Sequence, residues 1–213
     1  MRVAITLYQG FQLLDVAGPM DVFHAANSIV GDMVYEPDFF APSAGRVACS
    51  NGASFEVTRP LSEAHPPFNM VIVPGGAQVA TGYEQQRIIQ WLRLIGPQTP
   101  RLASICNGAF MLASTGLADK RRLTTHWRDA RRLAEEYPAV RVDADMICAR
   151  DGNIYSSGGV TAGIDLAMAL VAEDLGEEIT RNVAKLLLSP RFRSGSQRQF
   201  SDLESGPTDE WTP

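Results

Sequence analysis

Cys106 has a sequence context that is typical of a catalytic nucleophile. It stands between an apolar run at 102–105, which predicts a buried strand, and a second run at 109–113, which predicts the start of a helix. A thiol at such a sharp corner is lifted out of the sheet, and helix N–H groups directed at it lower its pKa and favour thiolate near neutral pH. A space-filling role in the core is the alternative, because free cysteine is often buried.

Two further side chains are candidates for handling the proton of this thiol. Asp15 is flanked by apolar residues, so burial is expected to raise its pKa and to let the carboxyl share a proton with the sulfur of Cys106. Its alternative role is to cap a helix that opens at Gly18. His126 is placed to orient or protonate a substrate, or else to form a packed wall beside Trp127.

Backbone N–H groups near the cysteine are candidates for stabilising negative charge on a ligand. Gly75 and Gly76 follow a buried strand, and Asn107 supplies the N–H directly after the nucleophile. Together they predict an oxyanion hole. A tight turn between strand and helix is the alternative for the two glycines.

The elements that must position these residues alternate between strands and helices. This alternation predicts an α/β fold with a single doubly wound, mostly parallel sheet, helices on both faces and a small β-hairpin. The expected strands are 2–8, 36–42, 53–58, 70–73, 102–105 and 121–125, the expected helices are 18–29, 85–95, 109–115, 129–137, 162–175 and 178–188, and the hairpin spans 140–157 about Asp151 and Gly152.

The candidate residues share one position relative to these strands. Asp15, the pair Gly75 and Gly76, Cys106 and His126 each fall at or just past the carboxyl end of an expected strand. Ligands bind at that edge of parallel sheets, so the four elements are expected to converge on one site.

Length and composition narrow the class of protein. The chain has 213 residues, a formal net charge of −5 and three cysteines without paired spacing. These values favour one domain at 1–200 and a linker-like or disordered tail at 201–213. We expect a cytoplasmic protein without a membrane span, a disulfide framework, a metal or another cofactor.

The stretch 181–200 carries five basic residues and no acidic one. It favours a solvated face, with contact to DNA or to a partner chain as the alternative. The chain has no recognisable helix-turn-helix, so we expect no nucleic-acid contact from the chain itself. The basic residues are Arg181, Lys185, Arg191, Arg193 and Arg198.

Five stretches together resemble the ThiJ/PfpI superfamily, which is related to class I glutamine amidotransferases. They are 14–23, 73–76, 104–109, 124–127 and 158–165, and the resemblance covers nearly everything up to about residue 200. It implies a flavodoxin-like, amidotransferase-like fold. Asn107 departs from the family pattern, in which threonine is common at this position.

Two branches of the superfamily are similar to this chain. The stretch 182–200 also resembles GlxA-type AraC-family regulators, which implies a ligand-sensing, homodimeric domain that binds a small nitrogen-containing metabolite around Cys106 and reaches DNA only through a separate helix-turn-helix part. The other branch, isocyanide hydratase, implies an enzyme that adds water to an isocyanide through Cys106 and Asp15. A redox or stress protein with an oxidisable Cys106 is the third alternative.

Overall fold

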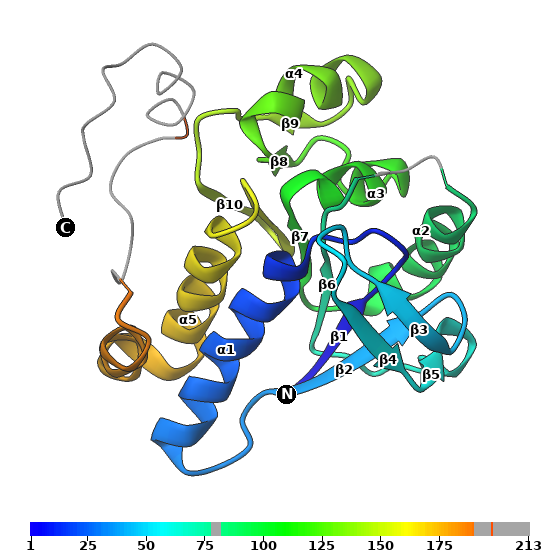
Figure 1. Ribbon diagram of the computed structural model, residues 1–213. Coiled ribbons are helices and arrows are strands. Elements are labelled where there is room, and N and C mark those ends of the chain that lie inside the picture. Colours follow the sequence, from blue (N-terminus) through cyan, green and yellow to red (C-terminus); the bar gives the residue numbers. More distant parts are fainter. Residues whose placement is uncertain (78–81, 190–196, 198–213) are drawn as a thin grey trace, which may run out of the picture.

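A seven-stranded sheet forms the centre of the computed structural model, which describes residues 1–77, 82–189 and 197 (Figure 1). The strand order is β10-β11-β7-β6-β1-β2-β5, and all neighbouring pairs are parallel except β10 with β11. The strands are β1 (Arg2–Thr6), β2 (Glu36–Ala41), β5 (Arg59–Pro60), β6 (Met70–Val73), β7 (Leu102–Ile105), β10 (Cys148–Asp151) and β11 (Ile154–Ser157).

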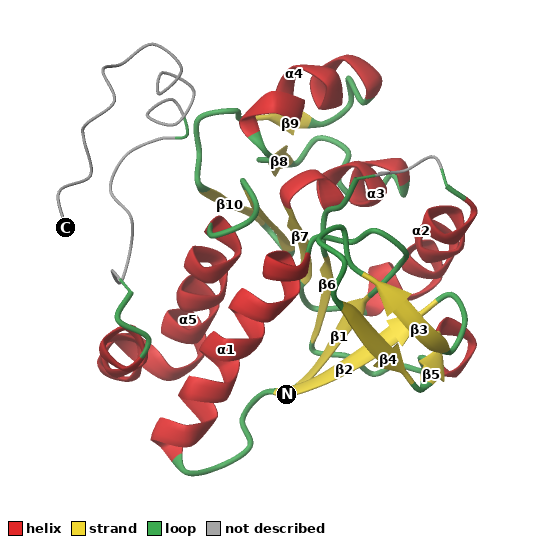
Figure 2. Cartoon of the chain, in the orientation of Figure 1, coloured by secondary structure: helices red, strands yellow, loops and turns green. Residues whose placement is uncertain are grey.

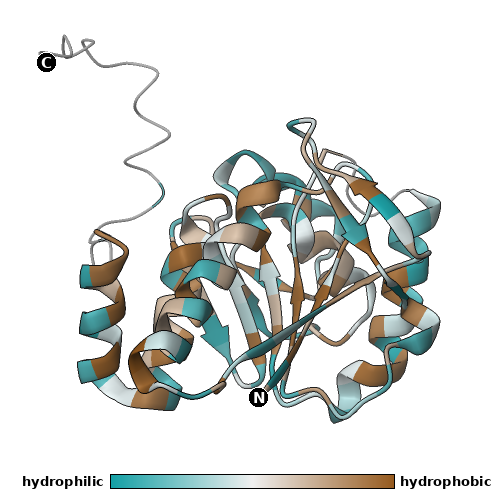
Figure 3. Ribbon diagram, turned by 60° about the horizontal axis from the view of Figure 1, so that its bottom comes forward, coloured by the Kyte–Doolittle hydropathy of each residue, from teal (hydrophilic) through white to brown (hydrophobic). Residues whose placement is uncertain are grey.

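The central strands are buried because helices cover both faces of the sheet (Figure 2). Every residue of β6, β7 and β11 is buried. Helices α1 (Leu13–Val30) and α5 (Ala162–Leu186) pack side by side on one face, while α2 (Tyr83–Ile95) and α3 (Ala109–Ser114) lie on the other. Apolar positions on these helices turn toward the sheet (Figure 3). The predicted fold class is confirmed.

A glycine allows α1 and α5 to approach closely. A Cβ on Gly18 would lie 2.8 Å from Cγ1 of Ile164, whereas one on Gly163 would make an ordinary contact of 3.5 Å with the ring of Pro19. Close contact between the two helices therefore depends on the missing side chain of Gly18. It fixes the first turns of both helices at the carboxyl edge of the sheet.

Helix α1 begins earlier than predicted. We expected Gly18 and Pro19 to open it, but it starts at Leu13 with Gln12 as N-cap, and Pro19 lies inside the helix. The Gln12 N–H donates to the carbonyl of Gly75 at 2.8 Å, so the neighbouring loop anchors the helix start. Asp15 thus lies within the first turn and is not a cap residue.

Three smaller features also differ from the expectation. The stretch expected at 121–125 is only β8 (Arg122–Leu123), which pairs with β9 (Arg141–Val142) in a separate two-stranded sheet beside α4 (Trp127–Glu136). Strand β3 (Gly45–Ala48) lies in a stretch expected to be all turn, and pairs with β4 (Ser54–Val57). In the β10–β11 hairpin, Asp151 is opposite Ile154, so the loop residues are Gly152 and Asn153.

The two helices expected near the C-terminus are continuous except for a kink. Gly176 inside α5 has φ 82° and ψ 172°, which is not helical. The predicted tail at 201–213, and the basic residues Arg191, Arg193 and Arg198, lie outside the described residues. In the part of the chain that is described, no helix is both long and apolar enough to span a membrane.

Candidate functional site

Cys106 lies at the corner where β7 gives way to α3. A single 3₁₀ turn, Cys106–Gly108, connects the two elements, and Cys106 has φ 56°. A left-handed conformation costs a residue with a side chain roughly 1 kcal/mol, so the surroundings must hold it. Gly108 permits the turn, because a Cβ there would lie 2.3 Å from the carbonyl oxygen of Val73.

Asp15 is fully buried at the start of α1 and accepts two backbone hydrogen bonds. Its Oδ2 accepts from the N–H of Gly75 and its Oδ1 from the N–H of Val160, both at 2.8 Å. The second bond joins residues 145 positions apart. Val160 has φ 51°, an uncommon conformation for a β-branched residue, so the peptide that contacts Asp15 is strained.

Two glycines enclose the side chain of Cys106. A Cβ on Gly159 would lie 2.2 Å from Cβ and 2.6 Å from Sγ of Cys106. A Cβ on Gly75 would lie 2.8 Å from Cβ of Cys106 and 3.0 Å from Oδ2 of Asp15. The backbone of Gly159 therefore lies against the sulfur, and the backbone of Gly75 lies between Cys106 and Asp15.

The electrostatics of Cys106 differ from the expectation. Burial, followed by the negative charge of Asp15, raises the pKa of the Cys106 thiol to about 12. The Asn107 backbone N–H opposes this rise but does not cancel it, and the charge of Asp129 raises the pKa further. The corner was expected to lower the pKa, but loss of water around the sulfur outweighs the helix N–H groups. The free thiol therefore keeps its proton at neutral pH.

The pKa of Asp15, in contrast, lies below neutral pH. Burial raises the pKa of its carboxyl to about 6, while the N–H groups of Gly75 and Val160 oppose that rise. The carboxyl is mostly ionised at pH 7. No hydrogen bond joins Asp15 to Cys106 in the described part of the chain, although the charge of Asp15 acts on the sulfur.

The N–H groups expected to form an oxyanion hole already have acceptors. That of Gly75 donates to Asp15, and that of Gly76 donates to Oδ1 of Asn107 at 2.9 Å. The Asn107 Nδ2 returns a bond to the carbonyl of Gly76 at 3.0 Å. Side chains of Asp15 and Asn107 thus accept from both glycines of this loop, and a ligand must displace them to use these N–H groups. The oxyanion hole stays a prediction.

His126 lies beside the Cys106 turn and not at the edge of the central sheet. It is the N-cap of α4, its Nδ1 accepts from the N–H of Arg128 at 3.3 Å, and its ring stacks on Trp127 at a centroid distance of 5.6 Å. Burial lowers the pKa of His126, so the ring is neutral at pH 7 with its proton on Nε2. It makes no hydrogen bond to Cys106 or Asp15 within the described residues.

A pocket of about 150 Å³ opens between the start of α4 and the start of α5. Cys106 is not among its lining residues, because Gly159 lies between the sulfur and this space. The volume fits a small molecule. The lining residues are His126, Trp127, Ile147, Gly158, Gly159, Val160, Thr161, Ala162 and Gln197.

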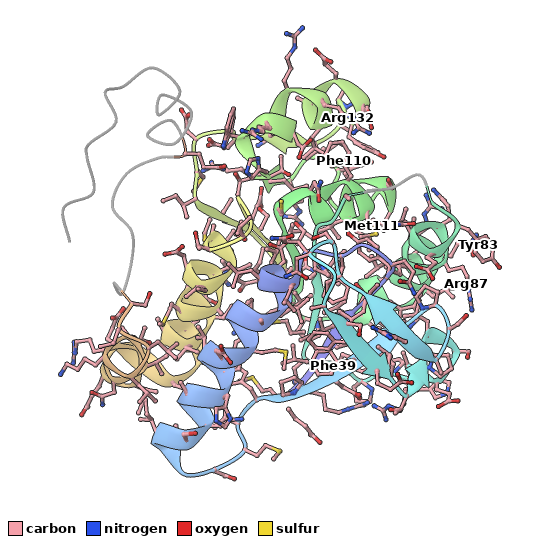
Figure 4. All side chains as sticks on the ribbon, viewed as in Figure 1. Phe39, Tyr83, Arg87, Phe110, Met111 and Arg132 are labelled. Atoms are coloured by element: carbon pink, nitrogen blue, oxygen red, sulfur yellow. The ribbon has the colours of Figure 1, made fainter. Side chains whose placement is uncertain are left out.

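Helix α4 is held over the site by contacts with α3. The guanidinium carbon of Arg132 lies 4.9 Å from the ring centroid of Phe110, and Figure 4 shows the two side chains together. Thr125, just before α4, donates from Oγ1 to the carbonyl of Cys106 at 2.9 Å. The wall formed by His126 and Trp127 is therefore tied to the cysteine turn.

Several residues of the site were not found as site residues from the sequence. Tyr8 is fully buried, donates to the carbonyl of Pro74 at 3.1 Å and lies close enough to Asp15 and Cys106 for both to raise its pKa. Val160 was a detectable candidate, because a second diglycine precedes it at a strand end. Thr125 and Gln197 lie in the stretches 124–127 and 182–200 that carry the family resemblance, but neither residue was assigned a role. In the described part of the chain, no group of three His, Cys, Asp or Glu side chains is placed to hold a metal, and no disulfide joins any of the three cysteines.

Comparison with known proteins identifies a family and several relatives. The sequence profile of the DJ-1/PfpI family matches residues 1–173. The isonitrile hydratase of Pseudomonas putida is 30% identical over 200 residues, which are 92% of this chain and 83% of that enzyme. The HTH-type transcriptional regulator GlxA of Rhizobium meliloti (strain 1021) is 30% identical over 188 residues, 86% of this chain but 56% of the regulator. The chain thus spans little more than half of that regulator's length.

A solved structure shares the fold. An AraC family transcriptional regulator from Pseudomonas putida superposes with a TM-score of 0.77 at 22% identity, and the match covers 87% of this chain and 98% of that one.

Proposed function

Since the chain belongs to the DJ-1/PfpI family, we propose that it is the ligand-sensing domain of an AraC-type transcription regulator and binds a small nitrogen-containing metabolite beside Cys106. The DNA-binding part would lie in the portion of such a regulator that this chain does not match. A homodimer is part of the proposal, and analytical ultracentrifugation tests it. The mass of a single chain at every protein concentration would contradict it.

The protonated state of Cys106 carries this proposal. A thiol with a pKa of about 12 is a poor nucleophile at neutral pH, because only the thiolate attacks. The N–H groups of Gly75 and Gly76, which would stabilise a developing negative charge, are occupied by Asp15 and Asn107. Both features favour a site that holds a ligand over one that transforms it.

The charges around the sulfur favour nitrogen in the ligand. Asp15 and Asp129 both raise the pKa of Cys106, so the potential at the sulfur is negative. His126 is neutral and does not oppose that potential. A protonated amine or an amide N–H is therefore a better ligand group than a carboxylate.

A thermal-shift screen of amines, amino acids and amides tests the sensing function. A ligand at 100 times its Kd stabilises the folded state by about 2.7 kcal/mol, which raises the Tm by about 5 to 10 °C in a chain of this size. The compound must be recovered unchanged. Trp127→Ala is expected to abolish the shift, while Arg131→Ala on the exposed face of α4 keeps it. The absence of any shift across the panel, or consumption of the ligand, would contradict the proposal.

An isocyanide hydratase is the second candidate, favoured by the match to 83% of the length of the Pseudomonas putida enzyme. In this case the sulfur of Cys106 attacks the isocyanide carbon. One water is then added, so that its oxygen bonds to the carbon and the net gain is one hydrogen on carbon and one on nitrogen. An N-substituted formamide leaves, and the thiol of Cys106 is restored. Asp15, mostly ionised at pH 7, exchanges the proton.

Turnover of cyclohexyl isocyanide to N-cyclohexylformamide distinguishes the enzyme from the sensor. The enzyme is expected to lose this turnover in Cys106→Ala and in Asp15→Asn. Turnover that survives Cys106→Ala would exclude the enzymatic assignment, and saturable binding without product would favour the sensor.

A further inference from the structure

Gln197 lies in a polar socket beside the site although it comes after the end of α5. Its exposed fraction is 4%, and its backbone N–H donates to the carbonyl of Asp145 at 2.9 Å. The side-chain Oε1 accepts from the N–H of Trp127 at 3.0 Å. A buried amide with partners at both ends holds one orientation.

The amide nitrogen of Gln197 contacts the wall that supports Cys106. Nε2 lies 3.0 Å from the carbonyl of Thr125, 3.0 Å from Oγ1 of Thr124 and 2.7 Å from the carbonyl of Met146. Thr125 in turn donates from Oγ1 to the carbonyl of Cys106. One residue, Thr125, therefore connects the amide to the backbone of the cysteine.

The same amide also packs against the opposite wall. A Cβ on Gly158 would lie 2.7 Å from Cδ of Gln197, and a Cβ on the next residue, Gly159, would lie 2.6 Å from Sγ of Cys106. Gly158 thus lies against the Gln197 amide, and its neighbour Gly159 lies against the sulfur of Cys106. A change in the seating of Gln197 must alter the space around the sulfur.

We propose that Gln197 is a positioning residue that fixes both walls of the Cys106 site and couples the state of this site to the seating of its own side chain in the socket. The coupling is reciprocal: a change at Cys106 that moves Gly159 weakens the seat of Gln197, and loss of the seat loosens the site. This holds whether the site senses a ligand or turns over a substrate, so it is independent of the function proposed above.

The first test measures alkylation of Cys106 by iodoacetamide, followed by peptide mass at each cysteine. Gln197→Met keeps the volume of the side chain but removes its hydrogen bonds. Loss of these bonds is expected to speed modification of Cys106 about tenfold. Gln90→Ala, on an exposed position of α2, is the matched control and keeps the wild-type rate. A wild-type rate in folded Gln197→Met would overturn the positioning role, because mere space filling is preserved.

The second test runs in the opposite direction and uses the unsubstituted chain. Trypsin needs an extended segment on both sides of a cleaved bond, so cleavage after Arg198 requires Gln197 to leave its socket. Carbamidomethylation of Cys106 adds bulk where Gly159 leaves no room, and is expected to speed cleavage after Arg198 about tenfold.

Cys106→Ala treated with the same reagent is the control for this second test, because Cys49 and Cys148 remain. An unchanged cleavage rate in the alkylated chain would overturn the coupling, as would an equal increase in Cys106→Ala. Cleavage after Lys185, on α5, reports general loosening, and an equal increase there would also overturn it.

Discussion

Cys106 and Asp15 are buried together, and burial leaves their pKa values on opposite sides of neutrality. The thiol has a pKa of about 12 and the carboxyl of about 6, so at pH 7 the first keeps its proton and the second has mostly lost it. A neutral thiol beside a carboxylate is a resting state that is suited to binding. A ligand that neutralises Asp15 would also lower the pKa of Cys106, because the charge of Asp15 is the second cause of its rise.

The alkylation rate of Cys106 is expected to rise continuously with pH. Below the pKa the thiolate fraction grows about tenfold per pH unit, so no plateau should occur between pH 6 and about 10. Asp15→Asn removes a negative charge near the sulfur and should increase the rate at a fixed pH. Site-resolved mass spectrometry with iodoacetamide measures both effects. A plateau near pH 7 would show that the thiol is acidic.

Asp15 should make the protein less stable as the pH rises. Its folded-state pKa of about 6 is above the ordinary value of 3.8, so the folded state binds the extra proton and the contribution to stability is lost as pH rises through 6. Between pH 4.5 and 7.5 the loss is about 2 kcal/mol in the free energy of unfolding.

Urea unfolding of the wild type and of Asp15→Asn at the two pH values isolates this contribution. The wild type is expected to lose more stability over this interval than the variant, because the variant has no carboxyl to ionise at that site. Parallel pH dependences for the two proteins would show that the carboxyl is not perturbed.

Gly159→Ala should disrupt the site beyond the cost of its backbone conformation. Gly159 has φ 95°, and an added Cβ would meet Cβ and Sγ of Cys106. Gly52, with φ 89° and nothing within 4 Å, is the matched control for strain alone. We expect Gly159→Ala to cost about 1 to 3 kcal/mol more than Gly52→Ala, measured by urea unfolding. Equal costs would mean that the loop yields without disturbing the cysteine.

At the scale of elements, the crossing of α1 and α5 decides where Asp15 and Val160 meet. Asp15 is in the first turn of α1, and Val160 precedes the first residue of α5 by two positions. The hydrogen bond between them spans the two helix starts, so the distance between the helices sets the geometry of the carboxylate.

Gly18→Ala should push these helices apart. Alanine favours a helix by up to about 1 kcal/mol over glycine, but a Cβ 2.8 Å from Ile164 overpacks the crossing by about 1 to 3 kcal/mol. We expect a net loss of stability for Gly18→Ala and a smaller effect for Gly163→Ala, whose Cβ would lie 3.3 Å from Cγ2 of Ile105, so that a small shift of this side chain relieves the contact. Urea unfolding measures both. A Gly18→Ala variant as stable as Gly163→Ala would contradict the close crossing.

The sequence predicted where strands and helices lie better than it predicted which strands pair with each other. The runs at 70–73 and 102–105 indicated buried parallel strands because such strands are apolar on both faces, and the structure confirms them. The two residues of β8 could not indicate that they pair outside the central sheet, so His126 follows no strand of that sheet, although it lies beside the Cys106 turn. A strand of this length carries no periodicity.

The sequence indicated which residues come together at the site better than it indicated how their pKa values are shifted. Asp15, Gly75 and Cys106 do converge, because each follows a strand of one parallel sheet. The sign of the pKa shift of Cys106 was not accessible, since it depends on Gly159 closing over the sulfur from a segment remote in sequence. Contacts between distant segments, such as Val160 with Asp15 and Gln197 with Thr125, leave no local pattern.

At the scale of the whole molecule, the site and a polar network occupy opposite ends of the sheet. Arg101, directly before β7, forms two hydrogen bonds with Asp174 of α5 at 2.6 and 2.7 Å. The hydroxyl of Tyr35, directly before β2, donates to the same carboxylate at 2.9 Å. These residues tie α5 to the amino ends of two strands, whereas Cys106 follows the carboxyl end of β7. We therefore expect that a substitution in this network changes stability without changing the chemistry of the site.

Asp174→Ala should lower stability without altering the site. The carboxylate is only 11% exposed, and its removal takes the acceptor from Tyr35 and leaves Arg101 only its longer ion pair with Glu173 at 3.7 Å, so we expect a loss of about 2 to 4 kcal/mol in the free energy of unfolding. Asp21→Ala, on an exposed position of α1, is the control and should change it by less than about 0.5 kcal/mol. Under native conditions the alkylation rate of Cys106 should equal that of the wild type in both variants. A changed rate in folded Asp174→Ala would mean that the two ends of the sheet are coupled through α5, because this helix begins at the site and carries Asp174 near its kink at Gly176.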